Sequence, residues 1–299
     1  MKQAVTRQLE KIVGAENVLT SKEERICYSY DATLFRSMPD VVVKPGTTEQ
    51  VSAIMKFANE EGVPVTPRGC GTGLSGGSIP LKHGIVMSMT RMNKIKEIDR
   101  ENLLAVVEPG VINLALDNTV EKVGLFYPPD PASKKQCTMG GNVAECAGGL
   151  RALKYGVTKD YVMALEVVLP AGDIIKTGAR TVKAVTGYDI TKLLVGSEGT
   201  LGIITEITVG LMPLPEHRET MLAIFPDLAD AGRAVSRIIA AGILPATLEF
   251  MDRATICCVE DFKGIGLPRD AAALLLIEAD GIKAVSYTHL RAHETGRKL

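Results

Sequence analysis

The chain has 299 residues, of which 46% are hydrophobic and 23% are charged, as is usual for a soluble globular protein. Its formal net charge is -1, it has no tryptophan, and aromatic residues make up only 4%, so it lacks the basic surface and stacking side chains of nucleic-acid-binding proteins. Nucleic-acid binding is therefore set aside, and the length allows two domains with separate cores.

Cysteine usage and hydropathy indicate a cytoplasmic protein. The six cysteines show no C-x-x-C spacing, and the start MKQAVTRQLEKIV is too polar for a secretory signal. No apolar stretch approaches the roughly 20 residues needed to cross a bilayer. We therefore expect reduced thiols, no transmembrane segment, and contact with the inner membrane only at its periphery, through partner proteins.

The first third of the chain predicts alternating helices and strands. Apolar residues at helical spacing near the N-terminus indicate an amphipathic helix, and residues 41–43 indicate a strand. A second helix starts at about Thr48, which can cap it, and ends before Gly62. Residues 63–65 form a short strand that leads into a glycine-rich stretch, and residues 85–89 form the next strand.

The glycine-rich stretch RGCGTGLSGG, residues 68–77, contains the G-x-G-x-x-G pattern of dinucleotide-binding folds. That fingerprint requires a helix directly after the glycine turn. Pro80 and Gly84 interrupt the residues that follow, so strand, loop, strand is the better interpretation. A Walker phosphate-binding loop also fails, because Gly77 stands where that motif requires lysine.

The chemistry of this loop favours an anion. No Asp or Glu occurs from Thr66 to Pro80, and glycines let consecutive backbone N–H groups form a concavity that binds negative charge. At about 1.5 to 3 kcal/mol for each hydrogen bond to a charged group, three or four donors contribute on the order of 5 kcal/mol. The alternative is a flexible surface loop without a ligand.

A second glycine cluster, PPDPASKKQCTMGGNVAECAGG, occupies residues 128–149, about 60 residues further on. Two such clusters in one domain indicate one long ligand that is held at two places. Strands follow at residues 164–169 and 174–175, and GSEGTLGIITEITV, residues 196–209, places another glycine pair before a β-branched strand.

The order and spacing of these motifs carry a resemblance to a known family. VVVKPGTTEQV, TPRGCGTGLSGGSIP, TMGGNVAECAGGLRALKYG and GYDITKLLVGSEGTLGIITEIT together resemble the FAD-linked oxidases of the vanillyl-alcohol oxidase type. The resemblance covers about residues 20 to 283. It is nearest to the branch that holds the glycolate oxidase flavin subunit, D-lactate dehydrogenase and D-2-hydroxyglutarate dehydrogenase.

The resemblance implies an α+β fold with two domains. A two-subdomain FAD-binding domain would span residues 1–215, and an incomplete α+β substrate or cap domain would span residues 216–283. A helix at residues 229–241 and strands at 248–252 and 274–281 are the expected elements of that cap domain.

The resemblance also implies which residues contact the cofactor. In this interpretation two amide-rich turns from separate strand connections hold the phosphates of FAD, with no helix end directed at them. The implied contacts come from the first loop, the second cluster and the start of the late strand: Arg68, Gly69, Cys70, Gly71, Thr72, Gly73, Leu74, Ser75, Gly76, Gly77, Pro129, Asp130, Ser133, Thr138, Gly140, Gly141, Asn142, Cys146, Gly148, Gly202, Ile203 and Ile204.

Some relatives attach flavin covalently through a histidine in the first loop. Thr72 stands at that place, so the resemblance implies a dissociable FAD. For each glycine, the simpler alternative is a turn that requires positive φ.

The implied reaction is oxidation of a D-2-hydroxy acid of the glycolate or D-lactate type. Hydride passes to the flavin, and electrons pass on to a protein or quinone acceptor, such as an iron-sulfur subunit or an electron-transfer flavoprotein. The alternatives are a non-catalytic FAD-binding subunit or fragment, and flavin-dependent transfer like that of alkylglycerone-phosphate synthase.

No catalytic residue is assigned. His83 and His217 are the available bases, but each has the sequence context of an ordinary surface residue. The family's metal or substrate histidines and its carboxylate-binding arginine fall beyond the point at which this chain diverges. We therefore expect the chain as given to be inactive alone.

The last residues do not resemble native protein. Residues 284–299, which include SYTHLRAHETGRKL, lack strand alternation and a sustained apolar stripe, and are interpreted as an artefact of a truncated reading frame. His289 and His293 at i and i+4 suggest a zinc site, but no metal is predicted.

Overall fold

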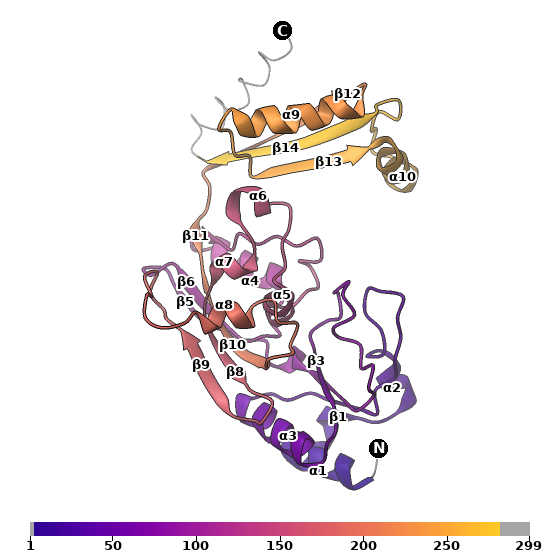
Figure 1. The fold of residues 1–299 in the computed structure, drawn as a ribbon, viewed down its shortest axis with the longest axis vertical. Helices are drawn as coiled ribbons and strands as arrows, with labels where there is room; N and C mark the ends of the chain where they lie inside the picture. Colours follow the sequence, from indigo (N-terminus) through magenta and orange to yellow (C-terminus); the bar gives the residue numbers. More distant parts are fainter. Residues whose placement is uncertain (1–2, 282–299) are drawn as a thin grey trace. The chain divides into compact units, whose positions relative to one another are not determined.

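The computed structural model describes residues 3–281 (Figure 1). These residues divide into two compact units, one that ends at Pro213 and one that begins at Leu214. Two short segments, 128–132 and 148–156, belong to the second unit although unit 1 surrounds them in sequence. The tail at 284–299, with His289 and His293, lies outside the described residues.

The first sheet of unit 1 contains the strand that leads into the glycine loop. The all-valine run of β2 and the buried IVMS of β4 suit a parallel sheet covered on its faces, which explains its two parallel pairings. The strand β1 pairs antiparallel with β2, and β4 pairs parallel with both β2 and β3. In spatial order the strands are β1 (Val18–Leu19), β2 (Val41–Val43), β4 (Ile85–Ser88) and β3 (Val65–Arg68).

Helices α1 (Gln3–Val13) and α3 (Thr48–Glu60) pack on this sheet. The expected stripe of α3 is confirmed, since its buried side chains share a core cluster with those of α1, β2 and β4. The expected N-cap, Thr48, is wrong by one residue. Thr47 is the N-cap and accepts a hydrogen bond from the Gln50 N–H at 3.3 Å. A short helix, α2 (Lys22–Ile26), begins with a capping box formed by Ser21 and Glu24.

The second sheet of unit 1 is antiparallel and has five strands. Its central strand reads IITEITVG, and the β-branched side chains of this strand alternate between two covered faces. In spatial order the strands are β5 (Ile95–Asp99), β6 (Leu104–Val107), β10 (Ile203–Gly210), β8 (Val162–Val168) and β9 (Ile174–Gly178). Directly after β10 in the chain, β11 (Met212–Pro213) pairs antiparallel with β7 (Leu125–Phe126) in a separate two-stranded sheet.

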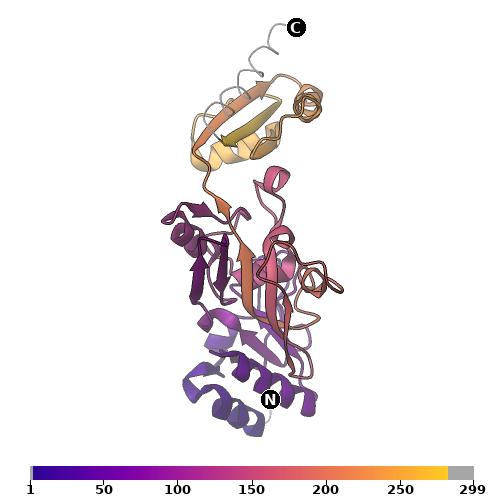
Figure 2. The same ribbon diagram turned by 90° about the vertical axis from the view of Figure 1, so that its left-hand side faces the viewer.

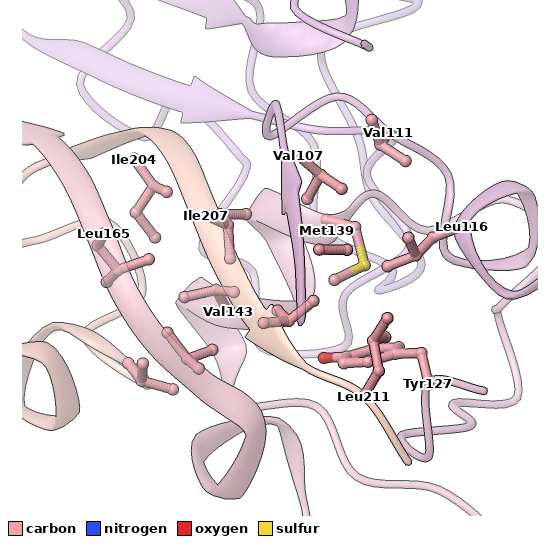
Figure 3. Packing of buried hydrophobic residues seen from close by; sticks show 14 of the residues in the cluster. Val107, Val111, Leu116, Tyr127, Met139, Val143, Leu165, Ile204, Ile207 and Leu211 are labelled. Atoms are coloured by element: carbon pink, nitrogen blue, oxygen red, sulfur yellow. The ribbon is translucent and has the colours of Figure 1, made fainter. Parts of the chain in front are cut away.

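Helices α4 (Asn113–Glu121) and α5 (Met139–Glu145) bury apolar side chains against the second sheet (Figure 3). Leu116 and Met139 are fully buried in this cluster, which also contains Ile207 of β10. Truncating such a side chain to alanine lowers the free energy of unfolding by about 2 to 5 kcal/mol. The burial of Met139, the first residue of α5, therefore stabilises the start of this helix. Short helices α7 (Thr158–Tyr161) and α8 (Ile190–Leu194) complete the unit.

The two sheets of unit 1 are joined by a shared core and by one buried carboxylate. Val168 and Ile203, from the second sheet, pack into the core of the first. Glu166 of β8 accepts hydrogen bonds from Thr48 at 2.7 Å and Thr205 at 3.1 Å. Burial alone would raise the pKa of Glu166, but these hydrogen bonds and Lys176 lower it below its ordinary value. The Glu166 carboxylate is therefore ionised at neutral pH.

Unit 2 contains a three-stranded antiparallel sheet with α9 (Leu228–Ala240) along one face (Figures 1 and 2). The elements predicted for a cap domain are confirmed as α9 and two of these strands. In spatial order the strands are β12 (His217–Phe225), β14 (Ala273–Gly281) and β13 (Thr247–Asp252). Helix α10 (Arg253–Lys263) and the single turn α6 (Ala152–Tyr155) contact the same sheet. None of the helices within residues 3–281 has an apolar run of membrane-spanning length.

The α+β fold class and the strand, loop, strand reading of the glycine loop are confirmed: β3 ends at Arg68, β4 begins at Ile85, and no helix intervenes. The interpretation of the second glycine cluster as a turn is wrong in part. Residues 139–145 of that cluster form α5, so a helix does begin within it. Glycine is unfavourable in a helix by about 1 kcal/mol, and tertiary packing of Met139 and Val143 overrides that preference here.

Candidate cofactor site

A cavity of about 260 Å³ lies within unit 1, at the end of β3. Three segments meet there: the glycine loop, the first turn of α5 with the residues before it, and the chain that leads into β10. Most of the residues predicted to contact a cofactor line this cavity: Arg68, Gly69, Cys70, Gly71, Thr72, Gly73, Leu74, Gly77, Ser133, Thr138, Gly140, Gly141, Asn142, Gly202, Ile203 and Ile204.

The glycine loop presents an uninterrupted run of backbone donors. Among the described residues, no acceptor is hydrogen-bonded to any backbone N–H from Gly69 to Ser78. The residues of this loop are half-buried or exposed, so these ten donors beside the cavity are open to an external acceptor, and amides in such a turn favour an anion. Gly71 and Gly76 adopt positive φ, at 69° and 81°, which turns successive amides toward one another.

The ends of the loop are held by Arg68. Arg68 as a whole residue is 6% exposed, and its Nη1 lies 3.4 Å from the Ser78 carbonyl oxygen and 3.3 Å from the Ser78 hydroxyl. Its guanidinium also lies 5.8 Å from the centre of the Tyr28 ring. Burial lowers the pKa of Arg68, and the charge of Asp31 opposes that effect. Arginine nevertheless stays protonated in proteins, so the loop closes around a fixed positive charge.

The second segment supplies fewer free amides than expected. The Thr138 hydroxyl caps α5 by accepting the Gly141 N–H at 3.3 Å. The Met139 and Gly140 N–H groups donate to the carbonyls of Val111 and Pro109, each at 2.8 Å. The protein therefore already uses the donors at this helix end. Cofactor contact by Thr138, Gly140 and Gly141 stays a prediction, in which their backbone N–H groups are not the free donors.

The free donor of the second segment is a side chain. Asn142 is 4% exposed and lines the cavity, and its Nδ2 has no hydrogen-bond partner among the described residues. An unpaired buried amide costs about 1 to 3 kcal/mol, which a ligand acceptor would recover.

A second cavity of about 480 Å³ adjoins the first. The two share a wall made by Pro67, Gly77, Glu198, Gly199, Gly202 and Ile203. The apolar residues that line the second cavity include Met55, Val63 and Val65, and its polar residues are Asn59, Thr66, Glu198 and Thr200.

Six predicted residues do not line the first cavity. Ser75 and Gly76 belong to the loop, and Cys146 ends α5 and packs against the core of the second sheet. Pro129, Asp130 and Gly148 belong to unit 2, where the Asp130 carboxylate lies 3.6 Å from Nε of Arg151. Cofactor contact by these six stays a prediction.

Sequence reasoning missed several lining residues, of which three carboxylates matter most. Asp31, Glu145 and Glu198 all line the first cavity. Glu145 and Glu198 lie inside motifs that were already singled out, between Asn142 and Cys146 and before Gly202. An anion site gives no reason to include acidic side chains, so only the fold reveals them. The other missed residues are Pro67, Ser78, Met89, Pro109, Cys137, Ala144, Ala147 and Gly199.

The histidines considered as bases lie elsewhere. His83 contacts the Met38 carbonyl through Nδ1 at 2.9 Å, and His217 contacts Glu219 through Nε2 at 2.6 Å. Neither lines the first cavity. Within residues 3–281 no group of three or more His, Cys, Asp and Glu side chains is placed to hold a metal ion.

Comparison with known proteins identifies both units. Residues 39–178 match the FAD binding domain family, and residues 214–296 match the family of the C-terminal domain of FAD linked oxidases. The chain is 54% identical over 278 residues to glycolate oxidase subunit GlcD of Bacillus subtilis, covering 93% of this chain and 59% of that protein. It is 41% identical over 256 residues to a D-lactate dehydrogenase of Anaerostipes hadrus, covering 85% and 54%.

Solved structures share the fold. An alkyldihydroxyacetonephosphate synthase superposes with a TM-score of 0.83 at 24% identity, covering 98% of this chain and 58% of that one. The chain thus spans less than two thirds of the length of each relative named here. The resemblance read from the motifs is confirmed: the chain belongs to the FAD-linked oxidases, and its cofactor is FAD.

Proposed function

We propose that the cavity of unit 1 holds the diphosphate of FAD on the backbone donors from Gly69 to Ser78. The observation that carries this proposal is the run of ten amides without acceptors, closed by the buried cation Arg68. Hydrogen bonds from neutral amides to a charged acceptor are worth about 1.5 to 3 kcal/mol each. A few of them suffice to hold a dianion without a lysine.

The residues that line the cavity fit the diphosphate of FAD. Side chains are excluded where the ligand would approach, because a Cβ on Gly69 would overlap the Thr138 hydroxyl and one on Gly71 would overlap the Arg68 guanidinium. The Asn142 amide would donate to an acceptor atom of the cofactor, and the adjoining cavity beside Gly202 and Ile203 would take its other end. Pro129, Asp130 and Gly148 remain part of the proposed contact set.

We further propose that FAD is held without a covalent bond. Thr72 stands where covalent relatives carry histidine, and a threonine hydroxyl does not form that linkage. Cys70 lines the cavity, but burial raises the pKa of its thiol, which disfavours the nucleophilic thiolate.

The whole protein is proposed to oxidise a D-2-hydroxy acid of the glycolate or D-lactate type. Bound FAD supplies a hydride acceptor. The proposal is supported by the names of the relatives, glycolate oxidase subunit and D-lactate dehydrogenase. Because one of them is a subunit, an iron-sulfur subunit or an electron-transfer flavoprotein is the proposed electron acceptor, with quinone as the other choice. We propose a cytoplasmic location, with membrane contact through such partners.

The substrate proposal is tested by anaerobic reduction. A chain extended to the length of the relatives named above and loaded with FAD is expected to lose its visible flavin absorption when D-lactate or glycolate is added, and to keep it with L-lactate. An extended chain that binds FAD but is bleached by neither D-lactate nor glycolate would favour the non-catalytic or transferase alternative.

A further inference from the structure

An acidic side chain lies against the proposed diphosphate loop. Glu145, the last residue of α5, accepts hydrogen bonds from the Ser75 hydroxyl, with both carboxylate oxygens 3.0 Å from Oγ. Its Oε1 also lies 3.3 Å from the point where a Cβ on Gly77 would stand and 3.6 Å from the corresponding point on Gly73. The carboxylate therefore lies against the glycine loop, beside the amides on which the diphosphate is proposed to bind.

The charges around the cavity do not favour a dianion. Among the described lining residues Arg68 is the one cation, whereas Asp31, Glu145 and Glu198 are acidic. Asp31 interacts electrostatically with Arg68, so that pair is balanced. No described residue forms a salt bridge with Glu145, and this side chain is exposed. A second anion that enters beside it meets like-charge repulsion that falls with distance and with salt.

We propose that Glu145 is an internal anion that lies against the glycine loop and sets the affinity for FAD. It takes the place of an external acceptor at Ser75, and the cofactor must displace it or bind beside it. This inference rests on the proposed function, because the repulsion exists only if the phosphates of FAD lie on this loop.

The variant Glu145→Gln separates charge from hydrogen bonding. Glutamine has the same shape and can still accept the Ser75 hydroxyl proton, so the support of the loop is kept and only the negative charge is lost. Because Glu145 is exposed at a helix end, the fold is expected to tolerate the change. Glu121→Gln is the matched control, since Glu121 is an exposed glutamate at the end of α4 and does not line the cavity.

The experiment compares the equilibrium binding of FAD and of riboflavin to the 299-residue chain after its cofactor has been removed. Glu145→Gln is expected to bind FAD about fivefold or more tightly than the parent at low ionic strength, and the gain is expected to shrink in high salt. Riboflavin, which carries no phosphate, is expected to bind the parent and the variant equally. Glu121→Gln is expected to match the parent for both ligands.

The possible results separate the role of Glu145 from the proposed binding of FAD. Unchanged or weaker FAD binding by Glu145→Gln, with normal binding by the parent, overturns the inference and leaves the proposed function intact. An equal gain for riboflavin overturns it too, because the effect would then not concern phosphate. A parent chain that binds no FAD overturns both.

Discussion

Gly71→Ala is expected to weaken FAD binding at least about 100-fold, equivalent to about 2.7 kcal/mol, while leaving the protein folded. Gly71 has φ +69°, and a Cβ there would overlap the guanidinium of Arg68. The variant must therefore strain its backbone and displace the buried cation that closes the loop. Equilibrium titration with FAD measures the loss, and circular dichroism checks the fold.

The control for this prediction is Gly62→Ala. Gly62 has φ +63°, nearly the same conformation, but no heavy atom lies within 4 Å of the position of its Cβ. It stands in the turn after α3 and lines neither cavity. Alanine costs about 1 to 2 kcal/mol of backbone strain at either site. The control therefore measures the effect of strain alone, and any further loss in Gly71→Ala comes from the overlap with Arg68. FAD binding by Gly71→Ala at the level of Gly62→Ala would show that the loop does not hold the cofactor.

Asp280→Ala is expected to lower the free energy of unfolding of unit 2 by about 2 to 4 kcal/mol. The Asp280 side chain is 1% exposed, and its carboxylate is paired with the Lys154 ammonium and accepts the Tyr155 hydroxyl at 2.8 Å. Lys154 also donates to the Asp280 carbonyl at 2.9 Å. Burial and the bond to Asp280 raise the pKa of Tyr155, so its hydroxyl is a permanent donor. Removing the carboxylate takes one acceptor from the half-buried Lys154 ammonium and one from the Tyr155 hydroxyl.

Urea unfolding followed by circular dichroism measures this loss, with Asp230→Ala as the control. Asp230 also forms an ion pair, with Arg233 on α9, but both side chains are largely exposed. Exposed pairs are worth about 1 kcal/mol or less, so the control is expected to change stability little. Equal effects of the two substitutions would mean that the buried cluster does not hold segment 148–156 against β14.

Periodicity and turn chemistry predicted most of the elements because the signals are local. The valines of β2, the stripe of α3 and the β-branched run of β10 each lie within one window of sequence. The cap at Thr47 instead of Thr48 is a shift of one residue, which two adjacent threonines make unavoidable. The glycine loop was predictable for the same reason, since its lack of acids and its glycines are contiguous.

The remaining features depend on residues that are distant in sequence. Helix α5 begins in a glycine-rich motif because Pro109 and Val111 accept its first amides and because Met139 is buried against the second sheet. The contact of Glu145 with Ser75 joins residues 70 positions apart, and that of Asp280 with Lys154 joins residues 126 apart. No local pattern specifies such pairs, so they were found only in the structure.

Hydrogen exchange of the glycine loop tests the central claim most directly. Without cofactor, the amides from Gly69 to Ser78 are expected to exchange rapidly, because none of them has an acceptor among the described residues. At saturating FAD, several of them are expected to slow at least about tenfold, while the amides at the start of α5 change little because Pro109 and Val111 already hold them. Saturating FAD that leaves exchange in residues 69–78 unchanged would contradict the account.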